Sequence, residues 1–407
     1  MTPGKIELLA PANNLKILKY AVNYGADAVY AGGKKFNLRS IHGNFTLDEL
    51  REGASYAHKK GARLYLALNS ILFEDDIREI AAYIKKLKKI DIDAIIVSDP
   101  GVFALVRKIW PAIGLHLSTQ VNTTNSLAAS FWYDAGAKRI NIAREISFED
   151  LKKISAAAPG QIEVFVHGAL CISYSGRCML SKYMAGRDAN LGRCAHSCRW
   201  RYYLMEEERP NLFYPIQQTR EGTFIYNSRD LCLLPKLGLI SDLGVDSIKI
   251  EGRMKTENYV SVVTWAYRRA LDFIYEKKFN EQNIGYLLGE LDKCSHRNFT
   301  LGFMFLKGRQ ELEDNENVGY IKKYTFIGTY EGFNRNYNGP LIKVKNQFHK
   351  GVEIDILQPK KDPVLFRADK ILDGAGKELA CANPNDKVIL PGLGKLDDYS
   401  IFRVKSV

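Results

Sequence analysis

Eight short runs rich in Val, Ile, Leu, Ala and Tyr recur along the first two thirds of the chain, and most are separated by helical patterns. Runs of this composition are typical of strands that are buried on both faces of a parallel sheet. They occupy residues 6–10, 27–31, 63–68, 94–98, 115–119, 139–143, 162–166 and 247–251. This alternation predicts a (β/α)8 barrel of the TIM type, with a doubly wound open sheet as the alternative.

The segments between the first runs carry the marks of amphipathic helices. Leu15, Leu18 and Val22 fall on one helical face. The next helix is expected to begin after Thr46, where Glu49 three residues later completes a capping box, and to end near Gly61.

The spacing of the runs changes after the seventh. We expect a catalytic domain over residues 1–300 that contains a cysteine-rich insertion at 167–246. A small all-β barrel domain is expected over 301–407, where short strands alternate with Gly, Pro and Asn turns. Loops after the C-terminal ends of barrel strands build active sites, so the insertion begins where chemistry is expected.

Polar residues that follow the predicted strands should converge at this end of the barrel. They are Tyr30, Asn69, Gln120, Arg144, His167, Glu251 and Arg253. His167 directly follows the seventh strand and is suited either to proton transfer or to orienting another group by a hydrogen bond.

The insertion opens with a cluster of cysteines. Four of the seven, Cys171, Cys178, Cys194 and Cys198, have the spacing C-x6-C-x15-C-x3-C. Thiolates suit zinc and iron–sulfur clusters, and inert buried thiols are the alternative. Structural zinc commonly uses two short pairs, and only Cys194 and Cys198 form one, so the spacing favours an iron–sulfur cluster and leaves zinc open.

Three further cysteines lie outside this cluster. Cys232 is either a further ligand or a core thiol ahead of an apolar helix, whereas Cys294 and Cys381 are expected to be structural. A radical-SAM C-x3-C-x2-C motif fails because residue 201 is Arg, and no P-loop, HExxH or GxSxG motif occurs.

Charge and composition narrow the class of partner. The net charge of +12 favours an anionic partner such as nucleic acid. No run of 18 apolar residues and no signal-peptide core occurs, so we expect a cytoplasmic protein without a membrane partner. In that compartment a tight cysteine cluster is typical of a metal or catalytic site rather than of disulfides.

The motifs together resemble a known family. The run EVFVHGALCISYSGRCMLS is similar to the signature of the collagenase-like peptidase family U32. Further blocks that resemble the family include HLSTQVNTTN, RDANLGRCAHSCRW, NSRDLCLL and SIKIEGRMK. The similarity extends along nearly the whole chain and is greatest to the subgroup that hydroxylates tRNA.

This resemblance implies an enzyme that forms 5-hydroxyuridine at the wobble position of tRNA without molecular oxygen. It implies prephenate as the hydroxyl source, an electron donor, and the anticodon loop as the RNA partner. It also implies a [4Fe–4S] cluster on Cys171, Cys178, Cys194 and Cys198, with Cys232 as the alternative fourth ligand. A peptidase is the alternative activity, and an RNA-binding protein with a purely structural cluster is a third.

Prephenate is a dicarboxylate, and arginine binds carboxylates through two hydrogen bonds. Arg144 and Arg253, followed by Arg177, are therefore the expected binding residues, with structural salt bridges as the alternative. Arg144, Arg253, His167 and Glu251 form the expected catalytic set. For RNA, the run RWRYY at 199–203 interleaves cations with aromatic rings. Lysines at 343–350, 360 and 361 offer either a second basic surface or a solvated strand face.

Overall fold

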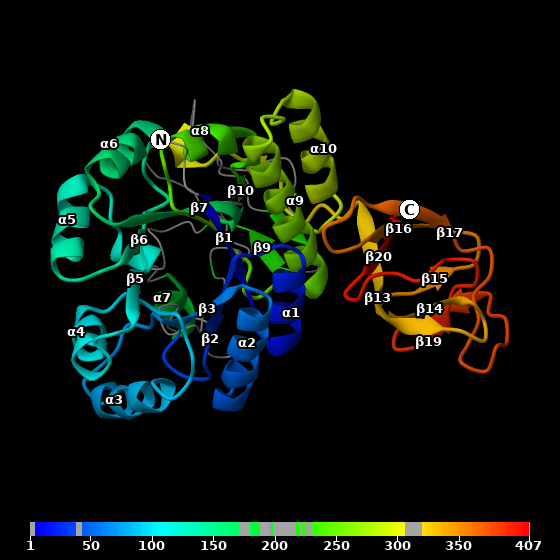
Figure 1. The fold of residues 1–407 in the computed structure, drawn as a ribbon, viewed down its shortest axis with the longest axis horizontal. Helices are drawn as coiled ribbons and strands as arrows, with labels where there is room; N and C mark the ends of the chain where they lie inside the picture. Colours follow the sequence, from blue (N-terminus) through cyan, green and yellow to red (C-terminus); the bar gives the residue numbers. More distant parts are fainter. Residues whose placement is uncertain are drawn as a thin grey trace. The chain divides into compact units, whose positions relative to one another are not determined.

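Eight segments form a closed parallel barrel (Figure 1). The computed structural model describes residues 5–37, 43–170, 180–187, 195, 197, 217–219, 222–224, 229–305 and 320–406. Strand β11 pairs in parallel with both β1 and β7, which closes the sheet and confirms the predicted barrel over an open sheet. The barrel strands are β1 (Glu7–Pro11), β2 (Ala28–Gly32), β3 (Arg63–Leu68), β4 (Ala94–Val97), β5 (Gly114–Leu117), β6 (Arg139–Asn141), β7 (Gln161–Ala169) and β11 (Ser247–Ile250).

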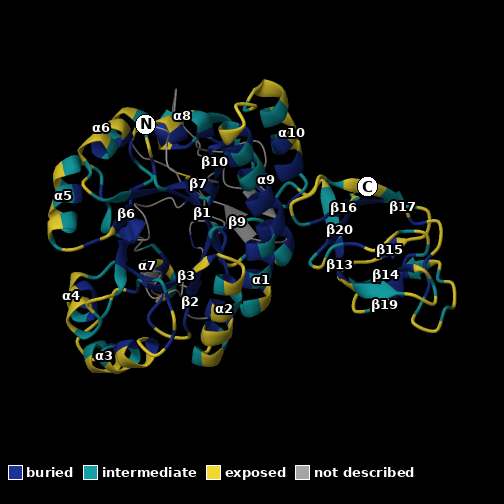
Figure 2. Cartoon of the chain, viewed as in Figure 1, coloured by how far each residue is buried: buried dark blue, intermediate teal, exposed yellow. Residues whose placement is uncertain are grey.

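Helices follow the first six strands and surround the barrel, with buried inner faces and exposed outer faces (Figure 2). The capping box predicted at Thr46 is confirmed, because its hydroxyl accepts the N–H of Glu49 and the Glu49 carboxylate accepts the N–H of Thr46. These helices are α1 (Leu15–Asn23), α2 (Leu47–Lys59), α3 (Asp76–Leu87), α4 (Pro100–Ile109), α5 (Ser126–Asp134) and α6 (Phe148–Ala157), with the short η1 (Thr119–Val121) before α5.

The segment between β7 and β11 adds structure at the end of β7. Strand β10 (Asp230–Cys232) pairs antiparallel with the last three residues of β7, and β12 (Phe299–Thr300) pairs in parallel with β10. The buried Arg297 guanidinium, just before β12, donates to Asp230 of β10 at 2.9 Å and holds these two added strands together. The other elements between β7 and β11 are α7 (Leu180–Ala185), β8 (Gln217–Thr219), β9 (Gly222–Phe224), η4 (Leu234–Lys236) and α8 (Leu237–Asp242). The short η5 (Phe303–Phe305) follows β12.

The chain divides into two compact units. The first comprises Met1–Val22, Ala26–Lys255 and Arg297–Tyr320, and the second comprises Asn23–Gly25, Thr256–His296 and Ile321–Val407. The second unit contains α9 (Glu257–Tyr275) and α10 (Glu281–Leu291), which fall within the range 1–300 expected for the catalytic domain, together with the expected antiparallel all-β domain.

The β-domain consists of a six-stranded sheet and a two-stranded sheet around an apolar core that includes Ile342, Ile354 and Phe402. The six-stranded sheet has the order β17 (Val364–Arg367), β16 (Glu353–Leu357), β20 (Ile401–Lys405), β13 (Tyr324–Asn334), β14 (Gly339–Val344) and β19 (Lys387–Ile389), and the smaller sheet pairs β15 (Phe348–His349) with β18 (Cys381–Ala382).

Candidate active site at the C-terminal end of the barrel

The pairing of β7 with β11 is irregular where both strands end. The register shifts between Lys249 and Ile250, so that Ile250 pairs with His167. The N–H of Glu251 then donates to the carbonyl of His167 at 2.8 Å. Irregular pairings of this kind re-aim side chains beside active sites. This hydrogen bond brings together His167 on β7 and Glu251, which directly follows β11; both are predicted catalytic residues.

Gly168 makes this close approach sterically feasible. It has φ of +110°, and a Cβ atom at this position would lie 2.6 Å from the carbonyl oxygen of Glu251. Both the backbone conformation and the short distance therefore require glycine.

Tyr30 links the candidate site to the barrel interior. Its hydroxyl donates to the carbonyl of Ile250 at 3.0 Å and lies 3.3 Å from Glu251 Oε2. Its ring lies 4.6 Å from the ammonium of Lys249, which forms an ion pair with Glu163 at 2.8 Å. Tyr30 thus contacts both the Glu251 carboxylate and a buried cation.

The two predicted carboxylate-binding arginines occupy different surroundings. Arg253 is 5% exposed and donates to the side-chain oxygen of Asn37. A Cβ atom at Gly32 would lie 2.8 Å from the Arg253 guanidinium, so this glycine makes room for the Arg253 side chain. The sequence carries no pattern that singles out Asn37.

Arg144 lies over an aromatic ring at the end of β6. It donates to the carbonyl of Ala169 at 3.0 Å, and its guanidinium is 5.5 Å from the ring centroid of Phe165. Its Nε atom is buried and has no hydrogen-bond partner in the part of the chain that the structure describes. An orphaned buried donor is costly unless something else satisfies it, which suits an anion-binding role.

Amide side chains connect the loops on the opposite wall of the barrel. Asn69 donates to Gln120 at 2.8 Å, and the Asn69 carbonyl accepts from Ser98 at 3.0 Å. The structure therefore brings together Tyr30 with Glu251, and Asn69 with Gln120, as the barrel prediction implied.

A buried ionic network fills the barrel below this site. Arg139 forms ion pairs with Glu7 and Glu163, and Tyr65 donates to Glu7 at 2.6 Å. Together with Lys249, the charged members are at most 4% exposed. Our sequence prediction missed this network, although each of the four charges stands within an apolar strand run, which was the available signal.

The network shifts the pKa values of its members. Burial would raise the pKa of Glu7, but the charge of Arg139 and hydrogen bonds from Arg139 and Tyr65 outweigh burial and lower it. Burial, followed by the charges of Arg139 and Lys249, holds the pKa of His116 well below its ordinary value. His116 is therefore neutral at physiological pH.

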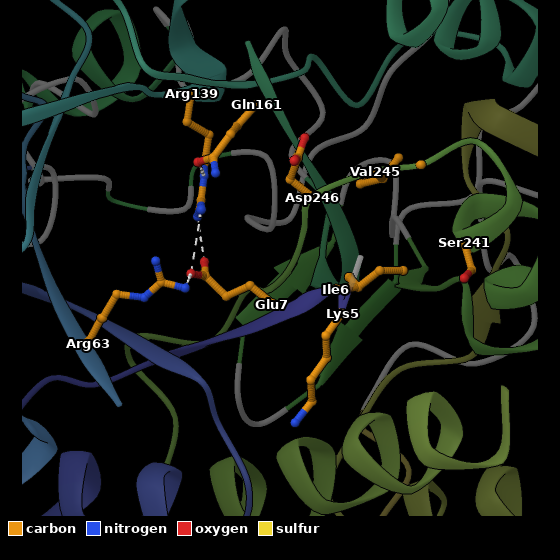
Figure 3. A pocket seen from close by; sticks show the side chains of 10 residues that line it. Lys5, Ile6, Glu7, Arg63, Arg139, Gln161, Ser241, Val245 and Asp246 are labelled. Atoms are coloured by element: carbon orange, nitrogen blue, oxygen red, sulfur yellow. Dashed lines mark hydrogen bonds and ion pairs between the residues drawn. The ribbon is translucent and has the colours of Figure 1, made fainter. Parts of the chain in front are cut away.

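A polar pocket of about 160 Å³ opens at the other end of the barrel (Figure 3). In Figure 3 the Glu7 carboxylate lies between the guanidinium groups of Arg63 and Arg139. Glu7, Arg63, Arg139 and Gln161 are the first residues of their strands, which places the pocket at the N-terminal end. This end of such barrels generally serves stability, so the pocket is separate from the candidate active site.

Most of the predicted cluster residues lie outside the described part of the chain: Cys171, Cys178, Cys194 and Cys198, together with Arg177. Cys232 is described and is 2% exposed, and it pairs with His167 across the antiparallel β10–β7 ladder. Cys294 is buried and Cys381 is half-buried. Among the described residues, no group of three or more His, Cys, Asp or Glu side chains is arranged to hold a metal ion.

The predicted RNA contacts are tested only in part. The run at 199–203 lies outside the described residues. On the β-domain, Lys350 pairs with Glu378 at 2.5 Å and Lys361 with Asp397 at 2.8 Å. Carboxylates thus offset part of that basic surface. No helix in the described ranges is long and apolar enough to span a membrane.

Fold and site together define a class: a (β/α)8 barrel with polar side chains at its C-terminal mouth, in a chain that also carries an antiparallel β-domain. The family models agree, since "Peptidase family U32" matches residues 13–314 and "Peptidase family U32 C-terminal domain" matches residues 322–403. The chain belongs to peptidase family U32.

Relatives of this chain are named for different activities. The tRNA hydroxylation protein P1 of Bacillus subtilis is 36% identical over 388 residues, covering 93% of this chain and 89% of that protein. The 23S rRNA 5-hydroxycytidine C2501 synthase of Escherichia coli is 37% identical, covering 67% of this chain and 40% of that protein. The collagenase of Porphyromonas gingivalis is 29% identical, covering 91% of each.

Proposed function

We propose that this chain is an RNA-modifying hydroxylase that forms 5-hydroxyuridine at the wobble position of tRNA. The observation that carries the proposal is the 36% identity to a tRNA hydroxylation protein over 93% of the chain. A wobble base lies in a single-stranded loop, so it can reach the mouth of a barrel without the opening of a duplex.

A [4Fe–4S] cluster is the proposed cofactor. Cys171, Cys178, Cys194 and Cys198 would hold it, and their thiolates are the donors that such clusters use. Cys232 remains the alternative fourth ligand, and its pairing with His167, four residues before Cys171 in the sequence, supports this alternative. When bound, the cluster would supply one-electron transfer.

Prephenate is the proposed hydroxyl source, which makes the reaction independent of molecular oxygen. Arg144 would bind one of its carboxylates, because the buried Nε atom of Arg144 has no partner within the described residues. Arg253 is the second proposed anchor, with Arg177 next, and Glu251 and His167 would exchange protons with the reacting groups. Tyr30 supports this role because its hydroxyl lies 3.3 Å from the Glu251 carboxylate.

The test is nucleoside mass spectrometry of tRNA from a strain that lacks this protein, complemented with variants. Cys171→Ala should abolish 5-hydroxyuridine, whereas Cys381→Ala, a half-buried cysteine on β18, should leave it near the wild-type level. Protein purified without oxygen should contain iron and absorb visible light. Normal 5-hydroxyuridine in the Cys171→Ala strain would refute a catalytic cluster.

A peptidase is the second candidate, favoured by the collagenase relative that covers 91% of this chain. Gelatin cleavage by the purified protein would support a peptidase. The cleavage should persist when the protein is purified from a strain whose tRNA is unmodified. We expect no cleavage, since neither a GxSxG nor an HExxH motif occurs in the sequence.

A further inference from the structure

Lys249 is a buried cation inside the barrel, on strand β11. Ser247 points into the barrel, since its hydroxyl donates to Glu7, and Lys249 lies two residues further on, on the same side of the strand. The Lys249 ammonium is paired with Glu163 at 2.8 Å. A buried ion pair generally stabilises a fold no more than apolar side chains of similar size would. Stability alone therefore does not explain a charge at this position.

Two buried aromatic rings lie beside the Lys249 ammonium. Their centroids are at 4.6 Å for Tyr30 and 5.3 Å for Phe165. Both distances are those of cation–π interactions, which are strongest where the cation is removed from water. Lys249 therefore helps to fix the orientation of one ring on β2 and another on β7.

Each of these rings also contacts a candidate active-site residue. The Tyr30 hydroxyl lies 3.3 Å from Glu251 Oε2, and the Phe165 ring centroid lies 5.5 Å from the Arg144 guanidinium. Glu251 and Arg144 follow β11 and β6, the two strands that flank β7. Lys249 is thus a support that these two contacts share.

We propose that Lys249 is a positioning residue for the hydroxylation: through Tyr30 it orients the Glu251 carboxylate, and through Phe165 it orients the Arg144 guanidinium. This inference rests on the proposed function, because it concerns the same site. A proton-transferring group and an anion-binding group act together only when both are held close to the productive geometry. A single buried cation that supports both rings keeps the two groups in a fixed relation.

Lys249→Met is the first test, because it removes the charge and keeps an unbranched side chain of similar length. Glu163 retains Arg139 at 3.3 Å and Asn141 at 2.8 Å as partners, so the variant leaves no carboxylate unpaired. We expect the initial rate of 5-hydroxyuridine formation, after induction of the variant in the deletion strain, to fall about tenfold or more. Nucleoside mass spectrometry measures this rate, and immunoblots correct it for the amount of protein.

Two companion variants separate positioning from a purely structural role. Lys249→Arg retains a cation that can lie over both rings, so it should recover most of the rate. Lys249→Met/Glu163→Gln removes both charges of the pair, which should return the thermal unfolding temperature toward that of the wild type while the rate stays low. A structural role of the ion pair predicts instead that the rate recovers together with the unfolding temperature.

Lys19→Met is the matched control. Lys19 also forms an ion pair, with Glu52 at 2.9 Å, and lies 5.4 Å from the ring centroid of Tyr56, but these residues belong to the outer helices α1 and α2. This variant should keep the wild-type rate. Tyr30→Phe should lower the rate, because the ring stays beside Lys249 while the hydroxyl near the Glu251 carboxylate is lost.

The outcomes distinguish this inference from the proposed function. A wild-type rate in Lys249→Met, or a double variant whose rate recovers with its unfolding temperature, overturns the role of Lys249 alone. If Lys249→Met does not fold, a wild-type rate in either Lys249→Met/Glu163→Gln or Tyr30→Phe overturns it. A wild-type protein that forms no 5-hydroxyuridine refutes the proposed function, and this inference with it.

Discussion

At the scale of single residues, Glu7 carries the clearest energetic role. Its buried carboxylate neutralises Arg139 and accepts hydrogen bonds from Tyr65 and Ser247, at 2.6 Å and 3.0 Å. Glu7→Gln removes the charge and leaves Arg139 with Glu163 as its remaining carboxylate. We expect the free energy of unfolding to fall by about 3 kcal/mol, as when one member of a buried ion pair is lost. Urea unfolding followed by circular dichroism measures this, with the exposed pair member Glu52 (Glu52→Gln) as a control that should change little.

The same residue predicts a pH dependence. The pKa of Glu7 lies below its ordinary value of 4.5 in the folded protein. The ionised Glu7 carboxylate therefore stabilises the folded protein above pH 4.5. This stabilisation is lost as the pH falls through the lower pKa that Glu7 has in the folded protein. The wild type should lose stability more steeply on acidification below pH 4.5 than Glu7→Gln does. Parallel acid profiles for the two proteins would show that folding does not lower the pKa of Glu7.

At the scale of elements, the junction of β7 and β11 should be the most sensitive position near the candidate site. Gly168→Ala introduces both a disfavoured φ and a contact of 2.6 Å with the Glu251 carbonyl. Gly61→Ala is a matched control, because Gly61 also has a positive φ, +77°, but nothing lies within 4 Å of an added Cβ. We expect a loss of about 1 kcal/mol for Gly61→Ala and clearly more for Gly168→Ala. Only Gly168→Ala should also reduce 5-hydroxyuridine in tRNA; equal effects of the two changes would argue against a close approach at β7 and β11.

Elements also show how far the sequence could predict the structure. The barrel could be predicted from the eight apolar runs because strands that are buried on both faces consist mostly of apolar residues. The capping box at Thr46 followed because its two hydrogen bonds are local. The antiparallel pairing of β10 with β7, and the contact of Asn37 with Arg253, join segments far apart in sequence and leave no periodic signal. The mouth residues were thus predicted by position, whereas Asn37 and the β10–β7 pairing were not.

At the scale of the whole molecule, the positive charge lies outside the core. The buried charged residues within the described ranges are balanced, with five cations and five anions: Arg139, Lys249, Arg253, Arg297 and Arg403 against Glu7, Glu163, Asp230, Glu290 and Asp355. The net charge of +12 is therefore carried by the other residues. A surface excess of this size attracts polyanions over distances of about 10 Å at moderate salt.

This surplus predicts how tRNA binding should respond to salt. Each phosphate contact releases condensed counterions, so the logarithm of affinity falls linearly with the logarithm of salt concentration. With about four contacts, the affinity should fall roughly a hundredfold between about 50 and 200 mM salt. Fluorescence anisotropy with labelled tRNA measures the slope, and gelatin, which carries no phosphates, serves as the comparison ligand. If tRNA affinity did not change with salt while gelatin bound tightly, the surface charge would have no role in RNA binding. A peptidase would then be the better-supported activity of this protein.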